Sequence, residues 1–150
     1  MCSSDLGASR AHGRGDLVRA LLEGIAFLNA IVLRRAESAA GTTVDEVRFG
    51  GGGARIAEWA QIKADILERP VVTVAVDEPG IFAAALAAFV GLGTFDTLER
   101  AQQLVVRAAR RFEPRAEQRD FYRALGLLFA EAHNAVQPIS HQLTKLSLPQ

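Results

Sequence analysis

The amino-acid sequence predicts an α/β fold that is rich in helix and contains one short parallel βαβ unit. The first observation is a short strand, Glu46–Phe49, followed by four glycines, Gly50–Gly53, and then a helix. The second is a β-branched run, Pro70–Val76, that follows this helix and is typical of a strand. Two strands joined through a helix pair in parallel. A two-stranded parallel sheet is a poor independent structure, so the sequence is typical of one flank of a larger α/β domain.

The first helix is expected from about Asp16 to about Ala39. Asp16 suits the N-cap or the first turn, and Gly41 suits the end of the helix. Helical spacing predicts one apolar stripe, made of Leu17, Leu21, Ile25, Leu28 and Val32. The second helix, which links the two strands, is predicted over about Ala54–Glu68. Its expected buried residues are Ile56, Trp59, Ile62 and Ile66.

An alanine-rich helix is predicted after the second strand, over Ile81–Val90, with Gly91 and Gly93 ending it. A short helix capped by Asp96 or Thr97 should then run to about Val106. Residues 107–114, RAARRFEP, are interpreted as a basic connector with Phe112 as its buried anchor.

The last long helix is expected from about Arg115 to Val136. Its predicted apolar face consists of Phe121, Leu125, Leu128, Ala132 and Val136. Pro138 should end or kink this helix, because proline lacks the N–H that a helix interior needs. Residues 138–150 are therefore expected to form a tail.

Composition excludes several classes of protein. The 150 residues fit one domain, and 49% hydrophobic residues can build a core. A formal net charge of +0 argues against nucleic acid as a partner. The single cysteine, Cys2, excludes a disulfide framework within the chain. No apolar run is long enough to span a bilayer and no signal peptide is recognised, so we expect no membrane partner and a cytoplasmic location.

Residues 1–6, MCSSDL, are expected to be a non-native leader. The string CSSDL is what a common sequencing adapter encodes when it is translated in frame. The hypothesis is that the native chain extends further upstream, and locating the intact gene would test it.

The glycine turn is the main candidate for a binding site, with Gly51, Gly52, Gly53 and Ala54 as the candidate residues. Glycine lets the backbone turn sharply and approach a bound group closely. The helix that follows offers unpaired N–H groups and the positive end of its dipole. A nucleotide pocket and a tight turn that binds nothing both remain open at this point.

Other chemistry has weaker support. No GxxxxGK[ST] phosphate loop occurs, and a GxGxxG pattern would lack its third glycine. Asp77, after the second strand, keeps a Rossmann-type NAD site open. The acids Glu58, Asp65 and Glu78 are expected to be solvated residues or caps, and Arg107, Arg110 and Arg111 a solvated face. The three histidines, at positions 12, 133 and 141, have no partner at metal-ligand spacing, so no metal site is predicted.

Three blocks of the sequence resemble the C-terminal part of the FGGY carbohydrate kinases, and most of all the xylulokinase-like branch. They are DLVRALLEGIAF (16–27), GGGARIAEWAQIKAD (51–65), and DEPGIFAAALAAFVGLGTF (77–95) with RRFEP (110–114). The second block is similar to the adenosine-binding GGGA turn of that family. Ile56 departs from the small polar residue often found there, and Ala83 from a common glycine. Glu58 falls where some relatives use a polar residue toward adenine, so the adenine contact stays open.

The resemblance implies a partial actin-like ATPase (ribonuclease H-like) domain over residues 7–137. It implies ATP-dependent phosphorylation of a sugar or polyol, with ATP held at Gly51–Ala54. The catalytic aspartate, the Mg²⁺ site and the sugar-binding domain are expected upstream, so the chain alone should be inactive. Gly53→Val is expected to weaken ATP binding. A homodimer stays open. The alternatives are a small helical interaction module that binds no nucleotide and a Rossmann-type NAD-binding piece.

Overall fold

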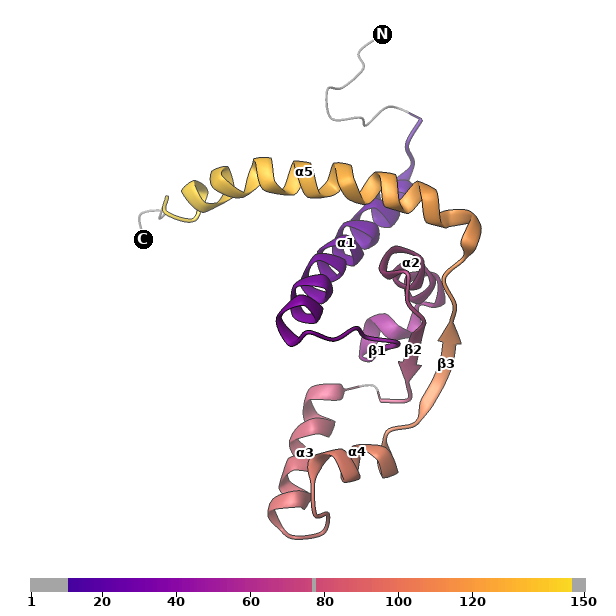
Figure 1. Cartoon of the computed structure of the whole chain (residues 1–150), viewed down its shortest axis with the longest axis vertical. Helices are drawn as coiled ribbons and strands as arrows, with labels where there is room; N and C mark the ends of the chain where they lie inside the picture. The colour runs from indigo at the N-terminus through magenta and orange to yellow at the C-terminus, as the bar shows by residue number, and fades with distance from the viewer. Residues whose placement is uncertain (1–10, 77, 147–150) are drawn as a thin grey trace.

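The computed structural model describes residues 11–76 and 78–146 (Figure 1). Its elements are α1 (Arg14–Ala40), β1 (Val47–Phe49), the 3₁₀ turn η1 (Gly52–Arg55), α2 (Ala57–Leu67), β2 (Val71–Val74), α3 (Pro79–Gly91), α4 (Leu98–Val105), β3 (Ala108–Phe112), the 3₁₀ turn η2 (Ala116–Gln118) and α5 (Arg119–Leu143). Figure 1 shows α1, α2 and α5 at one end of the molecule and α3 with α4 at the other. The expected leader, residues 1–6, lies outside the described residues.

The predicted βαβ unit is confirmed. β1 and β2 pair in parallel, with Val47 opposite Val71 and Phe49 opposite Thr73, and α2 connects them. The connecting helix differs from the prediction at its start, because η1 forms first and the chain is extended at Ile56 before α2 begins. As a result Ile56 is exposed instead of buried, whereas Ile62 and Ile66 are buried as predicted.

The third strand, β3, was not predicted from the sequence. It pairs antiparallel with β2, so the sheet is mixed, in the order β1-β2-β3. The segment predicted as a basic connector is therefore an edge strand. Four of its five residues are exposed and it carries no apolar alternation, so no strand pattern is visible in the sequence. Phe112, at its end, is buried and is the predicted anchor.

α1 has the predicted bounds within two residues. Asp16 lies in its first turn, where the carboxylate accepts a hydrogen bond from the Gly13 N–H at 2.8 Å, and Gly41 ends the helix with φ +64°. The predicted apolar stripe is wrong, because most of its residues are exposed. The buried face is offset from it and consists of Ala26, Phe27 and Ala30.

α5 also differs from its prediction. It continues through Pro138 to Leu143, so proline does not end it at residue 136 and the expected tail is partly helical. The predicted face is wrong in part, since Phe121, Leu128 and Val136 are exposed. The residues that pack on the core are Tyr122, Leu125 and Phe129.

α3 and α4 match their predicted positions. Pro79 lies in the first turn of α3, and the Thr97 hydroxyl caps α4 by accepting a hydrogen bond from the Arg100 N–H at 3.2 Å. The two helices contact each other and bury Leu86 and Ala101. Within residues 11–76 and 78–146, none of the helices combines the length and apolar character that a bilayer span requires.

Candidate functional site

The glycine turn lies where the parallel strands β1 and β2 end. The Gly51 N–H donates a hydrogen bond to the Val76 carbonyl at 3.5 Å, so the two loops that follow the strands touch. A Cβ on Gly50 would lie 2.9 Å from Val74 Cγ2 and 3.1 Å from Pro79 Cγ. The turn thus packs directly on the first turn of α3. The carboxyl edge of parallel strands is where α/β sheets bind their ligands.

The backbone of the turn requires glycine at one position. Gly51 has φ +87°, a conformation that side chains strongly disfavour. The Ala54 N–H donates to the Gly51 carbonyl at 2.9 Å and closes the 3₁₀ turn η1. Gly51 therefore reverses the chain between β1 and η1.

Gly53 is explained by the protein's own packing. A Cβ there would lie 2.1 Å from Cζ3 and 2.7 Å from Cε3 of Trp59, and 3.1 Å from Cζ of Phe49. Its φ is not in the left-handed region. Glycine at residue 53 is therefore required neither by a left-handed φ nor by open space for a nucleoside. The indole of Trp59 fills that space.

A cavity of about 220 Å³ opens beside the turn. It is lined by Gly51, Ala54, Arg55, Thr73, Val74, Val76, Ala109, Arg110 and Phe112. Two of the four predicted site residues, Gly51 and Ala54, thus face one cavity. Gly52 is exposed, and a Cβ there would meet nothing within 4 Å. The cavity combines a glycine-bounded apolar wall with two arginines, Arg55 and Arg110, so it suits a flat organic group near an anion.

A buried lysine, Lys63, lies against the aromatic rings that pack on the glycine turn. Sequence reasoning missed it. Lys63 is 6% exposed; its ammonium donates to Asn29 Oδ1 and lies 4.9 Å from the Phe49 ring centroid and 5.0 Å from that of Trp59. Burial lowers the pKa of Lys63 below its usual value. The available signal was the position of Lys63 directly after Ile62, on a helix whose neighbouring residues Ala60, Ala64, Ile66 and Leu67 are apolar.

The predicted acids are distributed differently from the expectation. Asp65 is neither solvated nor a cap: its side chain is fully buried and its carboxylate accepts from the Arg115 guanidinium at 2.7 Å and the Arg115 backbone N–H at 2.8 Å. Gln61 donates to it as well, at 3.0 Å. The contacts among Gln61, Asp65 and Arg115 connect α2 to the segment between β3 and α5, away from the glycine turn. Glu58 and Glu78 are exposed, as expected.

Of the remaining candidates among residues 11–76 and 78–146, Arg110 alone lines the cavity beside the glycine turn. Asp77, on which the Rossmann hypothesis depends, lies outside the described residues. In the arginine cluster, Arg111 pairs with Glu46 and Glu113 on the surface. Among residues 11–76 and 78–146, no three His, Cys, Asp or Glu side chains gather in a way that could hold a metal ion.

Several known kinases are similar to this chain. A glycerol kinase of Dechloromonas aromatica is 39% identical over 136 residues, which are 90% of this chain and 26% of the relative. An autoinducer-2 kinase of Yersinia enterocolitica is 34% identical over 111 residues, 74% of this chain and 21% of the relative. The chain thus spans about a quarter of the length of these relatives.

A solved structure has the same fold. The crystal structure of xylulose kinase from Rhodospirillum rubrum matches with a TM-score of 0.72 and 27% identity, over 90% of this chain and 27% of that one. The expectation of a partial actin-like ATPase domain is confirmed by this similarity, and neither alternative, the interaction module or the Rossmann piece, is favoured. Residues 3–92 match the C-terminal domain of the FGGY family of carbohydrate kinases. The chain therefore belongs to the FGGY family of carbohydrate kinases.

Proposed function

We propose that this chain holds the adenosine end of ATP in an enzyme that phosphorylates a hydroxyl group of a sugar or polyol. The observation that carries the proposal is the cavity beside the glycine turn, at the carboxyl edge of β1 and β2. Its position agrees with the rule for ligand sites in α/β sheets. Of the candidate residues Gly51–Ala54, Gly51 and Ala54 would form the wall against the nucleoside, Gly52 would lie exposed between them, and Gly53 would hold the turn against Trp59.

The turn would recognise adenosine mainly by shape. The N–H groups of Gly51 and Ala54 already donate to Val76 and Gly51 carbonyls, so they are committed to holding the turn. What the turn offers a ligand is a surface without side chains. Arg55 and Arg110 line the same cavity and would add positive charge toward the phosphates.

The chemistry of the complete enzyme would be in-line phosphoryl transfer, which depends on positioning and on neutralising the charge of the phosphates. We propose that Mg²⁺ and the general base are supplied by another part of the protein, as the family resemblance implies. The sugar or polyol would bind to an N-terminal domain. The relatives are named for glycerol, autoinducer-2 and xylulose. We therefore propose the acceptor only as a class, a sugar or polyol with a free hydroxyl group. The proposed location is the cytoplasm.

Titration of ATP into the purified 150-residue chain tests the proposal, with binding followed by calorimetry and by amide chemical shifts. The variant is Gly52→Val, because residue 52 has open space around it and no left-handed φ, so the fold should tolerate valine. Gly91→Val is the matched control, since Gly91 also has nothing within 4 Å and lies at the far end of α3.

We expect ATP to shift the amide signals of residues 50–55 and Gly52→Val to weaken binding about tenfold or more, equivalent to at least ~1.4 kcal/mol. Gly91→Val should bind like the wild type. Equal affinity of Gly52→Val and wild type, with both folded, would make the turn purely structural. Gly53→Val is unsuitable as a test, because it would displace Trp59.

A further inference from the structure

Phe49 and Trp59, the two aromatic residues beside the glycine turn, share contact with one buried positive charge. It belongs to Lys63, whose ammonium is 4.9 Å from the ring centroid of Phe49 and 5.0 Å from that of Trp59. Both distances are within the range of a cation–π contact. Asn29 of α1 accepts a hydrogen bond from the same ammonium. A single charge on α2 therefore connects α1 to both rings.

The indole of Trp59 depends on ring contacts for its position. Among residues 11–76 and 78–146, no atom accepts a hydrogen bond from its buried Nε1. The indole meets the Phe49 ring edge to face, at 5.3 Å between centroids and 84° between planes. Aromatic pairs occur over a range of centroid distances, about 4.5–7 Å, so this contact alone leaves the indole room to shift. The ammonium of Lys63 restricts the indole further, because it attracts the face of the ring.

The same two rings lie against Gly53 in the glycine turn. A Cβ added at Gly53 would lie 2.1 Å from Cζ3 of Trp59 and 3.1 Å from Cζ of Phe49, so both rings pack closely on this residue. The Gly53 carbonyl accepts a hydrogen bond from the Ile56 N–H at 3.1 Å, and Ala54, the next residue, lines the cavity beside the turn. A shift of the indole would therefore move Gly53 and the cavity wall next to it.

Stability does not account for a lysine at this position. The side chain is 6% exposed, and burial lowers the pKa of Lys63 below its usual value, so the site as a whole disfavours the charged form. An unbranched apolar side chain such as methionine would fill similar space without the cost of removing an ammonium from water. What the lysine adds, and methionine lacks, is a directed attraction to the two rings.

We propose that Lys63 is a positioning residue for the nucleotide pocket: its ammonium fixes the orientation of the Trp59 indole and thereby the position of Gly53 and the adjoining cavity wall. This role rests on the proposed function, since it concerns the binding of ATP at the turn. Removing the charge should then stabilise the fold and weaken ATP binding. A lysine that only supported the fold would change both quantities in the same direction.

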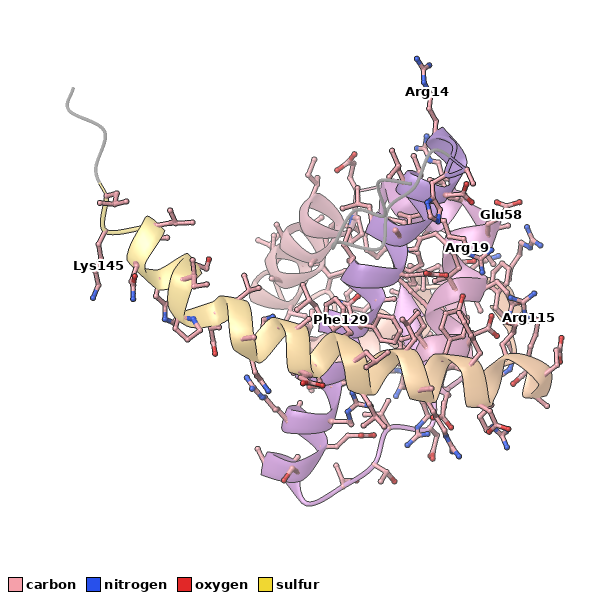
Figure 2. The ribbon with its side chains drawn as sticks, turned by 90° about the horizontal axis from the view of Figure 1, so that it is seen from above. Arg14, Arg19, Glu58, Arg115, Phe129 and Lys145 are labelled. Carbon is pink, nitrogen blue, oxygen red and sulfur yellow. The ribbon has the colours of Figure 1, made fainter. Side chains whose placement is uncertain are left out.

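Lys63→Met tests this role in the full 150-residue chain, with Lys145→Met as the matched control. Lys145 is exposed and lies at the isolated end of α5 (Figure 2). Calorimetry measures the affinity for ATP, and urea unfolding measures stability. Near-ultraviolet circular dichroism reports on the orientation of Trp59, which is the only tryptophan of the chain. Amide chemical shifts of residues 50–55, recorded without ATP, report on the turn itself.

We expect Lys63→Met to weaken ATP binding about fivefold, the size that corresponds to the loss of one cation–π contact. Its urea midpoint at neutral pH should be higher than that of the wild type. The tryptophan band and the amide signals of residues 50–55 should change, because the indole takes a new orientation. Lys145→Met should match the wild type in all four measurements.

Three results would overturn the role of Lys63 and leave the proposed function standing. The first is an ATP affinity of Lys63→Met equal to that of the wild type. The second is a loss of both stability and ATP affinity, because Lys63 would then act through the fold. The third is a set of unchanged amide signals at residues 50–55, because the charge would then have no effect on the turn. A wild type that binds no ATP would instead overturn the proposed function, and the role of Lys63 with it.

Discussion

Replacing Gly53 with alanine should destabilise the chain strongly, although the change adds one methyl group. The new Cβ would lie 2.1 Å from Cζ3 of Trp59, whereas carbon atoms in contact are about 3.5–4.0 Å apart. The indole would therefore have to move by well over an ångström. It is held on its other sides by the Phe49 ring, at 5.3 Å between centroids, and by the Lys63 ammonium.

The cost follows from these contacts. Overpacking a filled site costs about 1–3 kcal/mol, and the displaced aromatic pair is worth about 0.5–1.5 kcal/mol. We therefore expect Gly53→Ala to lower the free energy of unfolding by about 3 kcal/mol. Gly52→Ala is the control, because its Cβ meets nothing within 4 Å, and its effect should stay within about 0.5 kcal/mol.

Urea unfolding followed by far-UV circular dichroism measures both free energies. A double-mutant cycle with Trp59→Leu isolates the contact, since leucine leaves room for a Cβ at residue 53. In that background Gly53→Ala should cost less than about 1 kcal/mol, which gives a coupling energy of about 2 kcal/mol. If Gly53→Ala were as harmless as Gly52→Ala, or equally costly with leucine at residue 59, the indole would not be the reason for glycine here.

Further predictions concern three charged residues and use the same unfolding assay. Because burial lowers the pKa of Lys63, the wild type should gain stability as the pH rises toward 10.5, and Lys63→Met should be more stable at neutral pH and lack that gain. Asp65→Asn should cost about 2–3 kcal/mol, because the new amide would direct its N–H groups at the Arg115 guanidinium; an unchanged midpoint would contradict this. Hydrogen bonds from Arg123 lower the pKa of Glu68, so the stability this carboxylate contributes above pH 4.5 should be lost as the pH falls further, and Glu68→Gln should lack this change. Residue 68 has φ +52°, a left-handed conformation that glycine adopts without strain. The free energy of unfolding of Glu68→Gly should therefore exceed that of Glu68→Gln by about 1 kcal/mol.

The βαβ unit was predictable because its signals are local. Four glycines after an apolar strand and a β-branched run after a helix each specify backbone conformation within a few residues. β3 carries no comparable signal: it is an edge strand with three arginines nearby and only Phe112 buried. Its strand conformation depends on hydrogen bonds to β2, which is distant in sequence.

The faces of the long helices were mispredicted for a related reason. Hydrophobic periodicity gives most weight to large aliphatic residues, and α1 carries enough of them to define a stripe on the wrong side. The face that packs uses alanines: Ala26 and Ala30 of α1 and Ala60 and Ala64 of α2 are almost completely buried where the two helices are in contact. Small residues let two helices approach closely. The need for alanine on this face therefore depends on the partner helix and is not visible in the sequence of either helix alone.

The four consecutive glycines look equivalent in the sequence, but the structure explains the need for glycine at three of them in three different ways. Gly50 lies against Val74 and Pro79, Gly51 adopts φ +87°, and Gly53 faces Trp59. Gly52 has neither a neighbour within 4 Å nor a left-handed φ, so the chain itself does not require glycine there. A side chain at residue 52 would be excluded only by something outside the described chain. Because Gly52 lies between Gly51 and Ala54 of the cavity wall and has no packing role of its own, its substitution separates binding from folding.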